Sequence, residues 1–203
     1  MADRGRPRAF DRDTALLHAM RLFWERGYEA ASLSSLTAAM DINGPSLYAT
    51  FGSKEALFRA AVERYVAAES KETQAVLAAA ATAKEAIEAL LRRAARRNVR
   101  KGDPKGCLVM ISAIHGAPEN RHISEYLVSL RHSAERAIQE RIARGVAEGD
   151  VNPGADIDDL ASFYVAVLKG LSLSARDGAS KHELDSVVTR AMSAWDASPR
   201  SNE

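Results

Sequence analysis

The sequence predicts an all-α protein of about nine helices, with a small N-terminal unit followed by a larger helical domain. Three observations predict this class. Apolar residues recur every three or four positions along nearly the whole chain, no segment shows the alternation of a half-buried strand, and Gly-, Pro- and Asn-containing turns separate the helical segments. The chain has 203 residues, 46% of them hydrophobic, which is enough for a substantial core.

The first helix is predicted by Leu16, Met20 and Phe23, which lie on one helical face. It is expected to end at Gly27, because glycine readily adopts the left-handed conformation that follows a helix. Ser32 is a good N-cap for a short second helix.

A tight turn is predicted at residues 41–44, and Pro45 suits the first turn of a third helix. Leu47 and Phe51 lie one turn apart on the inward face of this short helix. Gly52 is expected to end it.

Ser53 caps a predicted fourth helix, and the Ala-rich residues 66–83 can continue it as a long connector. Beyond it, the segment 102–106 breaks a further helix, and a short apolar segment follows at 107–118. Three more helical stripes are predicted: Ile123, Leu127, Leu130, Ala134 and Ile138 in a helix ending near Gly149; Leu160, Phe163, Tyr164, Val167, Leu168 and Leu171; and Leu184, Val187, Val188, Ala191, Met192 and Trp195.

The charge balance restricts the classes of function. Lys plus Arg is 28 and Asp plus Glu is 27, so any nucleic-acid binding must be local and cannot rest on bulk charge. The chain shows neither a membrane-spanning apolar run nor an export signal, and its single cysteine, Cys107, cannot form an internal disulfide. We therefore expect a cytoplasmic protein with no membrane partner, no cofactor and no resident metal.

Residues 32–51 have the layout of a DNA-reading helix-turn-helix, with two short helices joined by a turn after a longer one. At about 100° per residue, the face opposite the buried apolar residues carries small or hydrogen-bonding side chains. Such a face can approach bases and phosphates closely in the major groove. The outward residues are Pro45, Ser46 and Ala49, with Tyr48 and Thr50 on the flanks.

Lys54 is a second signal, because a cation in the first turn of a helix opposes the helix macrodipole. The same position is favourable for holding a phosphate. The alternative is an ordinary solvated lysine.

The segment 27–58, "GYEAASLSSLTAAMDINGPSLYATFGSKEALF", resembles the DNA-binding domain of the TetR family of bacterial repressors. The Gly-Tyr after the first helix, the "SLYATF" helix and the "F-x-x-K-E-x-L" pattern carry the resemblance. "GCLV" and "ARDGAS" are similar to the ComR-like, AcrR-type subgroup, which includes copper-responsive regulators. The resemblance implies a homodimer that binds a palindromic DNA operator and is released by a small-molecule effector in the C-terminal domain.

By position, the resemblance implies base-side contacts from Ser34, Gly44, Pro45 and Ser46, with Ala49 on the same face. The phosphate contacts that it implies are Ser32, Tyr48, Thr50 and Lys54. Two positions depart from the family. Asp41 replaces a frequent turn glycine but tolerates the left-handed conformation, and Gly44 lacks the long polar side chain that is common there.

The chain opens with "RGRPR", in which Arg4, Arg6 and Arg8 are predicted to lie along a DNA minor groove. The predicted organisation is a basic arm at 1–10, a helix-turn-helix domain at 11–65, an effector-binding and dimerisation domain at 66–198, and a disordered tail at 199–203.

The effector pocket has a less specific signal. Its candidate lining is Cys107, Met110, Ile114, His115, Phe163 and Tyr164, and core packing explains the same apolar residues equally well. Cys107 is either a sensor thiol near Lys105 or a small buried hydrophobe. A metal-sensing alternative uses His115 or His122 with nearby glutamates.

The last two helices are predicted to pair with those of a second subunit in a four-helix dimer seam, in which Gly170 allows close approach. The predicted seam residues are Phe163, Val167, Leu168, Leu171, Leu184, Val188, Met192 and Trp195.

The segment 92–105 carries a net charge of +6 and is predicted to be a solvated face more readily than a DNA contact. An all-α enzyme is a remote alternative, since no catalytic set is apparent.

Overall fold

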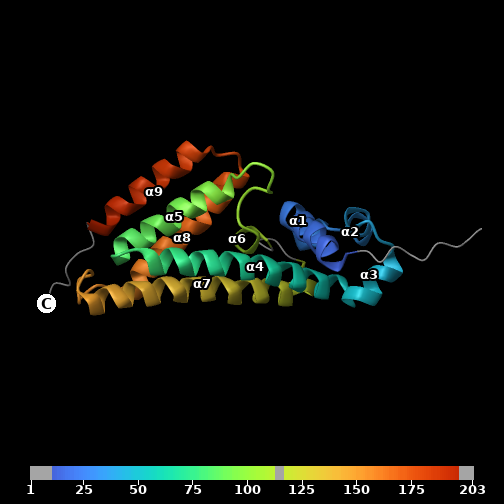
Figure 1. Ribbon diagram of the computed structural model, residues 1–203, viewed down its shortest axis with the longest axis horizontal. Helices are drawn as coiled ribbons and strands as arrows, with labels where there is room; N and C mark the ends of the chain where they lie inside the picture. Colours follow the sequence, from blue (N-terminus) through green and yellow to red (C-terminus); the bar gives the residue numbers. More distant parts are fainter. Residues whose placement is uncertain (1–10, 113–116, 197–203) are drawn as a thin grey trace, which may run out of the picture.

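The computed structural model describes residues 11–112 and 117–196 and is all-helical over these ranges, as the sequence predicts (Figure 1). No described helix is both long and apolar enough to cross a lipid bilayer. The helices are α1 (Arg12–Ala30), α2 (Leu33–Met40), α3 (Gly44–Phe51), α4 (Lys54–Ala79), α5 (Ala83–Asn98), α6 (Leu108–Ile111), α7 (Arg121–Glu148), α8 (Ile157–Arg176) and α9 (Lys181–Asp196), with a 3₁₀ turn at Pro118–Asn120 before α7.

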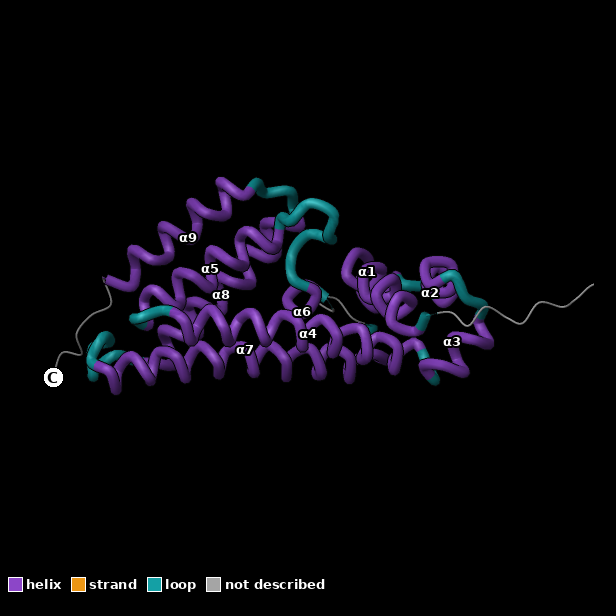
Figure 2. Tube along the Cα trace, viewed as in Figure 1, coloured by secondary structure: helices purple, strands orange, loops and turns teal. Residues whose placement is uncertain are grey.

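The molecule is elongated, and its two ends are joined by the long helices α4 and α7 (Figures 1 and 2). α1, α2 and α3 form one end, and α5, α8 and α9 form the other. α4 and α7 run side by side in the same direction. The His122 ring lies 3.0 Å from the Glu55 carboxylate near their starts, and Arg141 Nε donates to the Leu77 carbonyl, 3.1 Å away, near the end of α4.

Local side-chain bonds begin the helices of the first end. Ser32 accepts from the Ser35 amide (3.1 Å), and Ser53 accepts from the Ala56 amide (3.0 Å), which confirms both predicted caps. Asn43 begins α3 in the same way, accepting from the Ser46 amide at 2.8 Å.

Left-handed residues mark the predicted breaks. Gly27 has φ 76° and interrupts α1, although a short helical segment continues to Ala30 instead of ending there. Asp41 adopts φ 54° and ψ 45° and ends α2, so this departure from glycine is tolerated. Gly52 and Gly149 end α3 and α7 with φ near 80°.

Two hydrophobic cores fill the molecule. The first lies among α1–α4, with contributions from α6 and the first half of α7, and includes Phe23 and Phe58 with ring centroids 5.0 Å apart. The second lies among α5 and α7–α9 with the end of α4. The predicted boundary between residues 65 and 66 falls inside α4, so the two units share that helix.

Candidate nucleic-acid interface and internal cavity

α2 and α3 pack on α1 and α4 through a few apolar residues and leave their other faces open. Leu36 and Leu47 are fully buried, and Met40 and Phe51 nearly so. Tyr48, next to Leu47 on α3, is 50% exposed. The third helix is therefore held from one side only.

The outward face of α3 follows the predicted periodicity except that Tyr48, expected on a flank, lies on the open face, and Ser46, expected there, lies on an edge. Pro45, Tyr48 and Ala49 are exposed, while Ser46 and Thr50 are half-buried on its edges. Gly44 opens the helix, and no atom lies within 4 Å of the position that a Cβ would occupy there. This face is small, polar in part and sterically free.

The start of α2 lies next in sequence and carries hydroxyls. Ser32 and Ser34 are both exposed, and their Oγ atoms lie 3.0 Å apart. The Ser32 hydroxyl also donates to Ser35 Oγ at 3.1 Å. These hydroxyls are ordered by the cap that begins the helix.

Lys54 lies at the first position of α4, directly after α3. Its ammonium lies 4.5 Å from the centroid of the Tyr28 ring, a cation–π contact. Burial lowers the pKa of Lys54, and the neighbouring Glu29 carboxylate acts in the opposite direction. The positive charge is thus positioned on an aromatic ring at a helix N-terminus, a place that favours an anion.

Arg12 is a cation that the sequence reasoning missed. Its guanidinium lies 5.1 Å from the centroid of the Phe51 ring, which places it at the end of α3. Its position directly behind the basic arm is the signal that could have found it. Five predicted site residues lie outside the described ranges: Arg4, Arg6, Arg8, Ile114 and His115.

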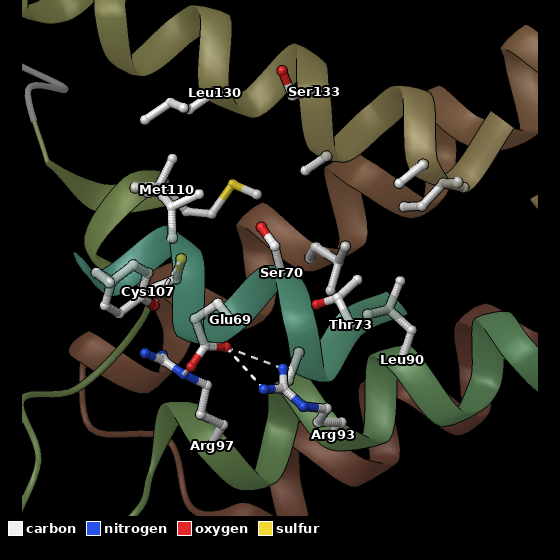
Figure 3. Close-up of a pocket in the computed structure, with 18 of the residues that line it drawn as sticks. Glu69, Ser70, Thr73, Leu90, Arg93, Arg97, Cys107, Met110, Leu130 and Ser133 are labelled. Atoms are coloured by element: carbon white, nitrogen blue, oxygen red, sulfur yellow. Dashed lines mark hydrogen bonds and ion pairs between the residues drawn. The ribbon is translucent and has the colours of Figure 1, made fainter. Parts of the chain in front are cut away.

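A cavity of about 320 Å³ lies between the two hydrophobic cores, walled by α4, α5, α6 and α7 with one residue of α8 (Figure 3). Cys107 and Met110 line it, as predicted. Most of its wall is apolar, and polar groups gather where α4 faces α5. The apolar wall includes Val66, Leu90, Ala94, Val109, Leu130, Ala134, Ala137, Ile138 and Leu168.

Glu69 receives two arginines from α5 at this wall (Figure 3). Arg93 donates from Nη1 and Nη2 to one carboxylate oxygen at 3.0 and 3.1 Å, and Arg97 donates from Nε to the other at 2.7 Å. Burial acts to lower the pKa of Arg97, but the Glu69 carboxylate bonded to it acts in the opposite direction, and the pKa is raised overall. Arg97 is therefore a charged guanidinium at the cavity wall.

Arg97 also contacts the first unit. Its guanidinium lies 4.7 Å from the ring centroids of both Trp24 of α1 and Tyr65 of α4. It donates to the Gly106 carbonyl at 3.2 Å, and the Trp24 indole donates to the same oxygen at 3.1 Å. One side chain thus contacts the cavity and the helix-turn-helix unit.

Cys107 presents its thiol beside this cluster. The Tyr65 hydroxyl donates to Sγ at 3.2 Å, and burial raises the pKa of Tyr65 well above its usual value, so the phenol keeps its proton. The Cys107 amide donates to Ser172 Oγ at 2.6 Å. Cys107 as a whole is half-buried, packing against the first core on one side and lining the cavity on the other.

Two predicted pocket residues do not line this cavity. Tyr164 is fully buried and packs against Trp195 with ring centroids 5.5 Å apart. Phe163 is 42% exposed on the outer face of α8. The prediction failed because one apolar stripe holds residues that face opposite sides. Sequence reasoning also missed Glu69, Arg93 and Arg97, and interpreted the run 92–105 as solvated.

The predicted dimer seam is wrong for several of its members. Leu171, Leu184 and Val188 are buried in the protomer, with at most 1% exposure, and Met192 is 5% exposed. Leu168 lines the cavity. These residues pack inward because α8 and α9 both cover α5. The large apolar residues that are exposed in this region are Phe163, Leu173 and Val187, and the predicted Val167 and Trp195 are half-buried.

The histidine of the metal-sensing alternative has another partner. His122 Nε2 lies 3.0 Å from Glu55, and Glu125 pairs with Arg121 at 2.9 Å. Among the described residues, no three His, Cys, Asp or Glu side chains are grouped to hold a metal ion.

Comparisons with known proteins cover nearly the whole chain. Residues 16–61 match the model of bacterial regulatory proteins of the tetR family, and residues 83–192 match the tetracyclin repressor-like C-terminal domain. The chain is 36% identical to the HTH-type transcriptional repressor ComR of Escherichia coli, over 95% of this chain and 92% of that protein. It is 33% identical to the repressor BdcR of the same organism, over 92% and 90%.

A solved structure is more similar still. It holds a cysteine-substituted variant of the TetR family regulator CifR, complexed with 26-bp double-stranded operator DNA. The two chains superpose with a TM-score of 0.91 and are 46% identical, and the match covers 94% of this chain and 100% of that chain.

Proposed function

The chain belongs to the TetR family of bacterial regulatory proteins, and we propose that it is a repressor that binds a palindromic operator as a homodimer and is released by a small-molecule effector. The observation that carries the proposal is the outward face of α3, small and free beside the cation of Lys54. The printed descriptions of ComR and BdcR as repressors, and of CifR in complex with operator DNA, support it.

α3 is the proposed reader of bases. Gly44, Pro45, Ser46 and Ala49 would face base edges, with Ser34 reaching them from α2. The phosphate contacts are proposed for Ser32, Tyr48, Thr50 and Lys54, and we add Arg12 because its guanidinium lies at the end of α3. Arg4, Arg6 and Arg8 remain the proposed minor-groove arm.

The dimer face that we propose is the outer side of α8 and α9. Phe163, Ala166, Gly170 and Leu173 recur at helical spacing on the exposed side of α8, and Val187 is 46% exposed on α9. Gly170 has no neighbour within 4 Å of a Cβ position in the protomer. A helix-interior glycine with open space beside it suits close approach by a second helix.

The dimer face is tested by Val187→Asp, with Thr189→Asp, exposed on the opposite side of α9, as the matched charge control. We expect Val187→Asp to give monomers in sedimentation velocity while leaving the circular dichroism spectrum unchanged. A variant that stays dimeric would place the interface elsewhere.

A second candidate function is a thiol-sensing regulator that uses Cys107, because this half-buried residue lines the cavity and its thiol accepts a hydrogen bond from Tyr65. Treatment with N-ethylmaleimide should then release the operator from the wild-type protein, with one adduct found by mass spectrometry. A Cys107→Ser protein should keep its operator. Equal release from both proteins would end this candidate.

We propose that the protein regulates transcription and is not an enzyme, and its membership of a family of regulators supports this. A repressor of bacterial genes works where the chromosome is, so the proposed compartment is the cytoplasm. The pairing of the described His122 with Glu55 disfavours a metal-sensing role for this histidine.

The proposed function is tested by an electrophoretic mobility shift on the DNA upstream of the protein's own coding region, with salt varied. A shifted protein–DNA band that weakens steeply with salt and is competed away only by DNA of the same sequence supports a sequence-specific repressor. A shifted band that unrelated competitor DNA removes as well as the same sequence does would show that the protein binds DNA non-specifically.

A further inference from the structure

The charges of the residues that line the cavity do not sum to zero. Glu69 is the one carboxylate among the described lining residues, and Arg93 and Arg97 are the two cations. None of the other described lining residues is an Asp, Glu, Lys, Arg or His. The described lining therefore carries one excess positive charge in an otherwise mostly apolar space.

The two arginines also retain donors for a further acceptor. Arg97 uses Nε for Glu69 and Nη1 for the Gly106 carbonyl, and Arg93 uses both Nη atoms for Glu69. No acceptor among the described residues takes a hydrogen bond from Arg97 Nη2 or from Arg93 Nε. A second carboxylate beside Glu69 would meet guanidinium N–H groups suited to charge-assisted bonds.

The rest of the cavity suits an apolar body. Leu90 of α5, Met110 of α6, and Leu130 and Ile138 of α7 face the same space of about 320 Å³. This volume lies at the small end of ligand pockets. Burying a short aliphatic or aromatic group there removes its surface from water, which favours binding.

We propose that this cavity binds a small organic monoanion, an apolar body bearing one carboxylate, with Arg93 and Arg97 holding the carboxylate beside Glu69. The proposal rests on the proposed effector-binding function and gives the effector its chemical class. The apolar wall holds the body, and the excess positive charge selects the anion over a neutral analogue of the same shape.

The same arginine links the ligand to the helix-turn-helix unit. A carboxylate that binds the unused Nη2 of Arg97 draws the guanidinium toward the cavity, away from the Trp24 ring and the Gly106 carbonyl. Arg176 of α8 supports the same end of α1 by donating to the Trp24 carbonyl at 3.2 Å. Loss of the Arg97 contact would therefore loosen α1 from the effector unit, and with it the placement of α2 and α3.

The test compares ligands that share a body but differ in charge. Isothermal titration calorimetry on the wild-type dimer uses hexanoate, hexanamide, hexylammonium and acetate. We expect hexanoate to bind about tenfold more tightly than hexanamide, a difference of ~1.4 kcal/mol. Acetate, which lacks the body, and hexylammonium, which has the wrong charge, should bind more weakly than either.

Variants then locate the carboxylate. Arg93→Gln should remove the preference for hexanoate over hexanamide, and Arg97→Gln should do the same. Arg92→Gln is the matched control, because Arg92 lies on the same helix, pairs with Glu88 at 2.6 Å and does not line the cavity. The wild-type ligand comparison needs no variant, so it decides the proposal even if Arg97→Gln fails to fold.

Operator binding is measured on the same samples by fluorescence anisotropy. If hexanamide binds as tightly as hexanoate, or if hexanoate does not bind while the operator does, the anion proposal is overturned and the repressor proposal stands. If neither hexanoate nor the operator binds, both fail. Hexanoate that binds and also weakens operator binding in the wild type, but not in Arg93→Gln, supports the proposal and its coupling.

Discussion

The two ends of the molecule use their polar side chains in different ways. At the α2–α3 end, the hydrogen bonds of Ser32, Asn43 and Ser53 reach three residues along the chain and begin helices. At the cavity end, polar contacts join distant segments. Arg97 reaches Glu69 from 28 positions away, and Arg141 reaches Leu77 from 64.

The comparison indicates that the exposed polar side chains of α3 are available for binding, whereas the polar side chains near the cavity stabilise the fold. The outward side chains of α3 make few contacts within the protein, so they can be changed for recognition at little cost in stability. The polar groups of the second unit hold helices together from within, so changing them costs stability. The following variants test this contrast, beginning with the largest expected effect.

Arg141 should be the most costly to remove. It is 4% exposed, and it donates to the carbonyls of Leu77 and Ala80 at the end of α4, at 3.1 and 3.3 Å. Arg141→Ala leaves both carbonyls without this donor and opens a cavity, so we expect the free energy of unfolding to fall by about 3–4 kcal/mol. Urea denaturation measures the change. Arg144→Ala, exposed on the same helix, should cost less than ~0.5 kcal/mol, and equal losses would remove the special role of Arg141.

Gly145 should come second. A Cβ there would lie 2.5 Å from Asp150 Oδ1 and 2.7 Å from the Ala83 Cβ, where α7 meets the start of α5. We expect Gly145→Ala to lower the free energy of unfolding by about 1–3 kcal/mol, although alanine is the better helix former. Ala143→Gly, at an exposed position of the same helix, measures the difference in helix propensity between alanine and glycine without the steric contact. A Gly145→Ala protein as stable as the wild type would show that this contact yields easily.

Lys54 tests the other end. Lys54→Gln removes a proposed phosphate contact, so operator affinity should fall by ~1 kcal/mol and the slope of log affinity against log salt should decrease by about one. Stability should change by no more than ~1 kcal/mol, the value of the cation–π contact with Tyr28. Lys71→Gln, exposed further along the same helix, is the matched control. An unchanged salt slope would remove Lys54 from the proposed interface.

Gly44 should show the smallest effect on the fold. Its Cβ position is open, so Gly44→Ala should change the free energy of unfolding by less than ~0.5 kcal/mol while weakening operator binding several-fold. Gly52→Ala is the contrasting control, because Gly52 has φ 80° and alanine would be strained there whatever the space. Operator binding unaffected by Gly44→Ala would mean that DNA does not approach the start of α3 closely.

The same contrast explains what the sequence could predict. Caps and turns are local, so Ser32, Ser53, Gly27 and the left-handed Asp41 could be placed from their neighbours alone. The outward face of α3 followed from a period of 3.6 residues and two inward apolar residues. Asn43 was within reach of the same reasoning but was assigned to the turn only.

Long-range contacts could not be predicted in this way. Nothing in a basic run shows that Arg97 will meet Glu69 of another helix and the ring of Trp24. Likewise, an apolar stripe on α9 does not reveal whether it covers α5 or a second protomer. Leu184 and Val188 proved to cover α5, which left Val187 on the exposed side.

Tyr48→Ala tests the central claim most directly, namely that the outward face of α3 serves DNA and not the fold. Tyr48 is 50% exposed. Thermal unfolding and operator anisotropy are measured on the same preparation. The account predicts an unfolding midpoint within error of the wild type and an operator affinity lower by about tenfold, or ~1.4 kcal/mol. An unchanged affinity, or a loss that appears only together with a lowered midpoint, would contradict it.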